Sequence, residues 1–157
     1  SDADVEKIVS CIMLTGMYGL HRGSIMQGAD GKIYFIDLER THDAILRDDV
    51  MRSLEHLITG GIRDNSIARV LVCHLFKHTQ LTDKERLAVL QRFCLPIKID
   101  FKDELQSKTF LENAPVVLAR LLQQLLDSQL ISLSVVGALK QSDPAPWVAA
   151  GCGAVIQ

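Results

Sequence analysis

The chain has 157 residues, of which 48% are hydrophobic and 23% charged, and its net charge is −2. This balance is typical of one globular domain and excludes an intrinsically disordered chain. Because the net charge is small and only 5% of the residues are aromatic, we expect no nucleic-acid binding and no attraction to anionic membranes.

The cysteines and the first residues indicate the cellular compartment of the protein. Acidic residues near the start, and Ser10 within the first apolar run, do not fit a signal peptide. No two cysteines form a CxxC pair, and a chain of this size does not need disulfides. We therefore expect reduced thiols, a cytoplasmic location and no structural zinc. The four cysteines are Cys11, Cys73, Cys94 and Cys152.

The N-terminal third predicts one helix followed by one β-hairpin. Apolar residues recur at helical spacing over residues 3–15, and Gly16 and Gly19 end that pattern. Two β-compatible runs then flank a turn at residues 28–31, in which glycine can adopt positive φ. The second run, Lys32 to Asp37, is rich in strand-forming residues. We expect two short antiparallel strands over about residues 24–37.

The remaining residues predict helices. Asp48 and Asp49 can start a helix that Gly60-Gly61 ends, and Asn65 resembles the N-cap of a helix that continues past Leu75. A capping box, Thr82-x-x-Glu85, should begin another helix, which Pro96 stops.

We expect a short helix between Phe101 and Leu111, and Pro115 should open a long apolar helix that breaks near residues 128–134. After Ser142 the prolines and glycines favour an irregular end. Arg120 and Asp127 lie within the apolar stretch from 115 to 139, which predicts a buried helix or helix pair and no membrane span.

One stretch carries candidate chemistry. It consists of a polar loop with His21 and Ser24, the predicted hairpin, and the carboxylates Asp37 and Glu39 after its second strand. The hairpin would bring these side chains together at one end. Hydroxyl and carboxylate oxygens suit Mg²⁺, which needs few protein ligands when phosphates and water complete its shell.

This pattern resembles the catalytic loop, hairpin and metal-binding aspartate of kinase-like phosphotransferases. In many members a loop histidine precedes an Asn-Ile-Leu/Met strand, and a later strand ends in Ile-Asp-Phe/Leu. Here the corresponding residues are His21, Ser24-Ile25-Met26 and Ile36-Asp37-Leu38. The resemblance implies that Asp37 and Ser24 hold Mg²⁺ and, with it, ATP. It also implies a mainly α fold, like a kinase C-terminal lobe with one short β-hairpin.

The sequence also departs from the family pattern. Gly19 stands where the catalytic aspartate is expected, Ser24 replaces the metal-binding asparagine, and Glu39 replaces a glycine. A glycine-rich loop and a strand lysine are absent from the sequence. We therefore expect a single domain over residues 1–157 that belongs to a larger protein or is completed by a partner. It would be a pseudokinase with a regulatory or binding role, or, if active, an ATP-dependent kinase in which His21 and Glu39, or His42, assist catalysis.

Structural roles account for the same residues equally well. His21 can brace its loop, Asp37 can cap a turn, and Glu39 can pair with Arg40 at the surface. His74 and His78 lie one helical turn apart without a recognisable third metal ligand, which favours an ordinary histidine pair.

Two other functions fit the sequence. The low-charge stretch from 115 to 139 can exceed what one small core buries, which favours a helical interaction module with a protein partner or a second copy of the chain. Alternatively, His21 and Glu39 could serve a thiolate in a cysteine hydrolase or acyltransferase. Cys152, between Gly151 and Gly153, is then the most accessible candidate.

Overall fold

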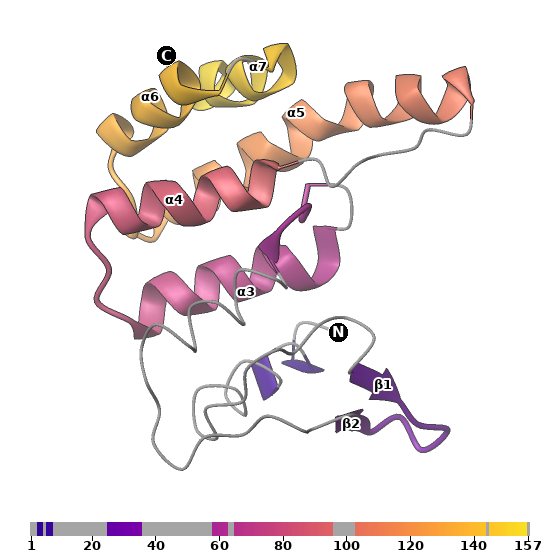
Figure 1. The fold of residues 1–157 in the computed structure, drawn as a ribbon. Coiled ribbons are helices and arrows are strands. Elements are labelled where there is room, and N and C mark those ends of the chain that lie inside the picture. The colour runs from indigo at the N-terminus through magenta and orange to yellow at the C-terminus, as the bar shows by residue number, and fades with distance from the viewer. Residues whose placement is uncertain are drawn as a thin grey trace.

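The computed structural model is mainly helical with one two-stranded antiparallel hairpin, which confirms the predicted fold class at that level (Figure 1). The structure describes residues 3–4, 6–7, 25–35, 58–62, 65–95, 103–143 and 145–156. Its elements are β1 (Ile25–Gln27), β2 (Ile33–Phe35), α3 (Asn65–His78), α4 (Asp83–Cys94), α5 (Glu104–Asp127), α6 (Leu133–Ser142) and α7 (Pro146–Val155).

The described helices stack in layers (Figure 1). α4 packs on α3, and α6 packs on both α4 and α7. In Figure 1 the hairpin is drawn on the side of α3 that faces away from α4. The long helix α5 contacts α3 near its C-terminal end and α7 along much of its length. The N-terminal part of α5 projects past the other helices in Figure 1.

One apolar core joins these helices. It extends from Ile58 to Cys152, and its largest fully buried side chains include Phe76 and Phe93. At the outer edge Phe110 and Trp147 meet edge to face with ring centroids 5.7 Å apart, a preferred arrangement for aromatic pairs. The helices are thus held mainly by burial of apolar surface.

Several local predictions are confirmed. Thr82 and Glu85 form a complete capping box at the start of α4, and that helix ends at Cys94, just before Pro96. The predicted break near 128–134 separates α5 from α6, and Gln129 there has a φ of 58°. Only residues 3–4 and 6–7 of the first expected helix are described, and they are helical.

The prediction that Pro115 opens the apolar helix is wrong. Pro115 lies inside α5, which begins eleven residues earlier at Glu104 and is capped by Asp103. Proline cannot donate a hydrogen bond to the carbonyl of Leu111, and Leu111 lies on the exposed surface of α5. The predicted short helix from Phe101 to Leu111 is therefore the first part of α5.

The predicted irregular end is also wrong, because residues 146–155 form α7. Pro146 occupies the first turn, where a missing N–H costs nothing. Gly151 permits close packing, since a Cβ there would lie 2.9 Å from Leu118 Cδ2 of α5. Burial of Trp147, Val148 and Cys152 against the other helices outweighs the low helix propensity of the glycines.

Candidate functional site

The hairpin predicted to carry the catalytic stretch has a defined register. Ile25 pairs with Phe35 and Gln27 with Ile33. In the turn, Gly31 has a φ of 78°, and its N–H donates to the carbonyl of Gly28 over 2.9 Å. The chain therefore enters at Ile25 and leaves at Phe35 at the same end of the hairpin.

Asp30 fixes the turn at the opposite end. Its carboxylate accepts hydrogen bonds from the Lys32 N–H at 3.0 Å and from the Tyr34 hydroxyl at 2.7 Å. The Tyr34 hydroxyl, followed by the Lys32 N–H, lowers the pKa of Asp30 below its usual value, and the same bond raises the pKa of Tyr34. Both side chains are exposed. They therefore hold the turn without forming an enclosed site.

The four predicted site residues, His21, Ser24, Asp37 and Glu39, lie outside the described residues. The structure relates these residues to the hairpin only by their positions in the sequence. In the sequence Ser24 directly precedes Ile25, and Asp37 follows Phe35 by two residues. Their roles in binding Mg²⁺ and ATP stay predictions.

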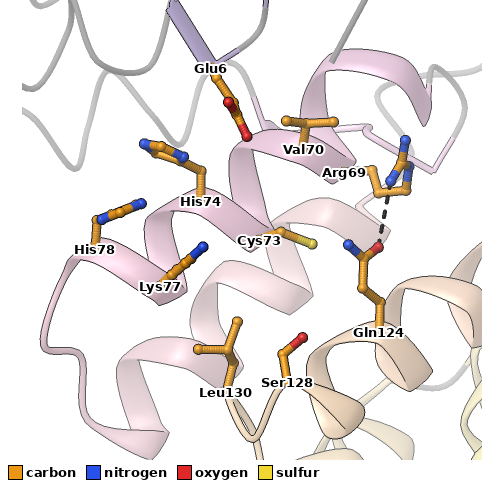
Figure 2. Close-up of a pocket in the computed structure, with 10 residues that line it drawn as sticks. All are labelled: Glu6, Arg69, Val70, Cys73, His74, Lys77, His78, Gln124, Ser128 and Leu130. Carbon is orange, nitrogen blue, oxygen red and sulfur yellow. Dashed lines mark hydrogen bonds between the residues drawn. The ribbon is translucent and has the colours of Figure 1, made fainter. Parts of the chain in front are cut away.

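A separate pocket of about 460 Å³ lies along α3 (Figure 2). Two rows of side chains, spaced four residues apart, form its helical wall. The opposite side comes from the C-terminal end of α5 and the turn after it, and Glu6 lies above α3. The lining residues are Glu6, Arg69, Val70, Cys73, His74, Lys77, His78, Gln124, Ser128 and Leu130.

Hydrogen bonding and charge organise this α3 pocket. Arg69 Nη1 donates to Gln124 Oε1 over 3.5 Å and so links α3 to α5. The rings of His74 and His78 have centroids 4.2 Å apart and are tilted by 44°. Burial lowers the pKa of His74, and the nearby charge of His78 lowers it further, while Glu6 acts in the opposite direction. Near neutral pH His74 is therefore mainly uncharged.

Lys77 and His78 also lie in the last turn of α3. A cation there stabilises a helix by about 0.3–1 kcal/mol, because the helix C-terminus carries partial negative charge.

Within the described part of the chain, no group of three or more histidine, cysteine, aspartate or glutamate side chains could hold a metal ion.

The described cysteines are free thiols in different surroundings. Cys94 and Cys152 are buried, whereas Cys73 is partly exposed beside the α3 pocket. Burial raises the pKa of Cys94, and it raises that of Cys152 to about 11. The prediction that Cys152 is the most accessible thiol is wrong, since its side chain is fully buried. Its flanking glycines belong to α7, and Gly151 allows close packing of that helix against Leu118.

The sequence reasoning missed the α3 pocket. The spacing of His74, His78 and Lys77 was available as a signal, but Gln124 and Ser128 lie some fifty residues away in the sequence. Only packing of α5 against α3 brings them to the same place.

Comparison with protein-family models, curated proteins and solved structures found no match to this chain. Among the described residues, no helix combines the length and apolarity needed to cross a bilayer.

Proposed function

We propose that the chain is a kinase-like domain with a partly degraded Mg²⁺–ATP site and a regulatory or binding role. The single observation that supports this proposal is the hairpin register, in which Ile25 lies opposite Phe35. Such a hairpin, between a histidine loop and an Ile-Asp-Leu segment, is the arrangement that the resemblance requires.

Asp37 and Ser24 are the groups that would hold the metal. A carboxylate and a hydroxyl are hard oxygen donors, which suit Mg²⁺. A bound Mg²⁺ ion would neutralise charge on the nucleotide phosphates. Glycine at position 19 cannot accept a proton. Catalysis would therefore need another base, such as Glu39, with His21 positioning the loop, and we expect binding to survive better than phosphotransfer.

Thermal unfolding with nucleotide tests this proposal. With about 1 mM ATP and Mg²⁺ or Mn²⁺ we expect a rise in Tm, since a ligand that binds only the folded state stabilises it. Asp37→Ala should abolish the rise. Asp30→Asn is the matched control, because it removes a carboxylate from the opposite end of the same hairpin, and it should retain the rise even if its own Tm is lower.

Absence of any nucleotide-induced rise in the unsubstituted protein would contradict nucleotide binding. An equal rise in Asp37→Ala would show that nucleotide binds elsewhere. Phosphotransfer to a generic acceptor by the unsubstituted protein would show that the site is less degraded than proposed.

An interaction module is the second candidate function, favoured by exposed apolar side chains on α5. Leu105 is 71% exposed, Leu111 54% and Val116 49%. A shallow groove of about 360 Å³, lined by Val116 of α5 and Val155 of α7 among others, continues this surface. Exposed apolar side chains next to an apolar groove are typical of a protein contact surface.

Size-exclusion chromatography with light scattering tests the second candidate. If the surface joins two copies, the unsubstituted protein should be dimeric and Leu111→Glu monomeric, with unchanged helical content by circular dichroism. Leu133→Glu is the control, because Leu133 is equally exposed but belongs to α6. A monomer at all concentrations would remove self-association through this surface.

A further inference from the structure

The α3 pocket concentrates groups that bear or can take up positive charge. Arg69 and Lys77 have cationic side chains, and the imidazole rings of His74 and His78 can donate hydrogen bonds through their N–H groups. Among the described residues, Glu6 is the only acidic one that lines the pocket. Within the described part of the chain, Lys77 has no ion-pair partner.

The arrangement of these groups leaves room for a ligand. Arg69 and Lys77 are eight residues apart in one row of α3, and His74 and His78 form the adjacent row. In Figure 2 the Lys77 ammonium points back along α3 toward Cys73, and the two imidazoles lie on the same side of the helix. Gln124 and Ser128 add polar groups from α5 and its C-cap. The volume is within the range of small-molecule sites.

We propose that the α3 pocket binds a small molecule through a phosphate group, held by Lys77 and the histidine pair, with Arg69 at the far end. A phosphate oxygen accepts hydrogen bonds from ammonium and imidazolium groups, and such charge-assisted bonds are stronger than neutral ones. A metal is less well served, because Lys77 would repel it and no three-ligand group exists among the described residues.

Binding of an anion should favour proton uptake by His74. His74 is kept mainly neutral by burial and by the positive charge that His78 and Lys77 place beside it. A bound dianion would place negative charge beside His74 and so favour its imidazolium form. Of the described residues that line the pocket, Glu6, Arg69 and Lys77 are the charged groups near the histidine pair. Affinity should therefore rise as the pH falls through the histidine range.

Titration of the full chain with sulfate, followed by NMR of the histidine ring nitrogens, tests the proposal. Sulfate serves as a phosphate mimic that stays a dianion over the tested pH range, so that only the protein titrates. With ionic strength fixed by chloride, we expect saturable shifts of the His74 and His78 signals. The affinity should be at least about fivefold higher near pH 6 than near pH 8. Inorganic phosphate and glycerol phosphate should compete with sulfate.

Two variants make the result specific. Lys77→Met should weaken binding about tenfold or more, and His78→Gln should weaken it as well, whereas Lys108→Met should leave the affinity unchanged. Lys108 is an exposed lysine of α5 that pairs with Glu112 at 3.9 Å. All three positions are exposed, so the variants should fold, which circular dichroism checks.

The proposal is overturned if sulfate produces no saturable shift at either histidine, or if Lys77→Met binds as tightly as the unsubstituted protein. It does not depend on the hairpin site, and Asp37→Ala should bind sulfate normally. Loss of sulfate binding in Asp37→Ala but not in Lys77→Met would place the anion at the hairpin end and also overturn the inference.

Discussion

Gly151 shows how one residue sets the contact between two helices. A Cβ at this position would lie 3.0 Å from Leu118 Cβ and 2.9 Å from Leu118 Cδ2. The first of these neighbours is fixed to the backbone of α5 and cannot rotate away. We predict that Gly151→Ala lowers the free energy of unfolding by about 1–3 kcal/mol, as overpacking usually does. Urea denaturation measures the change.

Gly153 is the matched control, because it lies in the same helix two residues later. An added Cβ there would meet only Lys140 Nζ, at 4.0 Å. Gly153→Ala should therefore be neutral or stabilise the protein by up to about 1 kcal/mol through helix propensity. Equal effects of the two substitutions would show that the α5–α7 packing is looser than described.

The thiols should differ in reactivity. We predict that iodoacetamide at neutral pH modifies Cys73 much faster than Cys94 or Cys152, because the thiolate is the reacting form. Cys73 is partly exposed, whereas burial raises the pKa of Cys152 to about 11. Peptide mapping by mass spectrometry gives the rates. Fast modification of Cys152 in the folded protein would contradict this and restore the hydrolase hypothesis.

At the scale of single elements, α4 depends on its first turn. The Thr82 N–H donates to Glu85 Oε1 at 3.1 Å, and the Glu85 N–H donates to Thr82 Oγ1 at 3.2 Å. Thr82→Ala should cost about 1 kcal/mol of stability, since it leaves the Glu85 N–H without its side-chain acceptor. Thr109→Ala, within α5 and exposed, is the control. A loss no larger than that of Thr109→Ala in urea denaturation would contradict the capping role.

The elements that sequence reasoning predicted well are those with local signals. The capping box at Thr82 and the glycine turn before Lys32 are determined by contacts within a few residues. The predictions at Pro115 and at the glycine-rich C-terminal end were wrong, because the local propensities of these residues oppose a helix. Packing of α7 on α5 overrides those propensities. A contact between residues so far apart in the chain leaves no local pattern in the sequence.

The candidate sites differ in the same way. His21, Ser24, Asp37 and Glu39 were found from a motif, and of this stretch the structure describes the hairpin over residues 25–35. The α3 pocket needs both α3 and the end of α5, so its composition follows from the tertiary fold. The i, i+4 spacing of the histidine pair was visible in the sequence, but the proximity of Gln124 and Ser128 to that pair was not.

At the scale of the whole molecule, the two candidate sites lie on different elements. The hairpin end belongs to β1 and β2, whereas the α3 pocket uses α3, the end of α5 and Glu6. Arg86 of α4 connects elements next to that pocket. Its guanidinium lies 5.4 Å from the Phe76 ring centroid and donates a hydrogen bond to the carbonyl of Leu130, a pocket residue. The position of the turn after α5 is therefore tied to α3 and α4.

This arrangement gives stability a pH dependence through His74. Its pKa is lowered in the folded state, first by burial and then by His78, so the unfolded chain binds the proton more readily. Stability therefore falls as the pH drops through about 6.5, the unfolded pKa, and levels off below the folded pKa. Because the ring is only partly buried, we expect a slope well below the ~1.4 kcal/mol per pH unit of one fully coupled proton.

Urea denaturation between about pH 5 and pH 8 measures this effect as a difference between the unsubstituted protein and His74→Gln, in which the contribution of His74 is absent. The unsubstituted protein should lose more stability on acidification than His74→Gln. Added sulfate should narrow that difference if the α3 pocket binds a dianion, since the bound anion stabilises the folded imidazolium form. An identical pH profile for the two proteins would show that His74 is not desolvated in the folded chain.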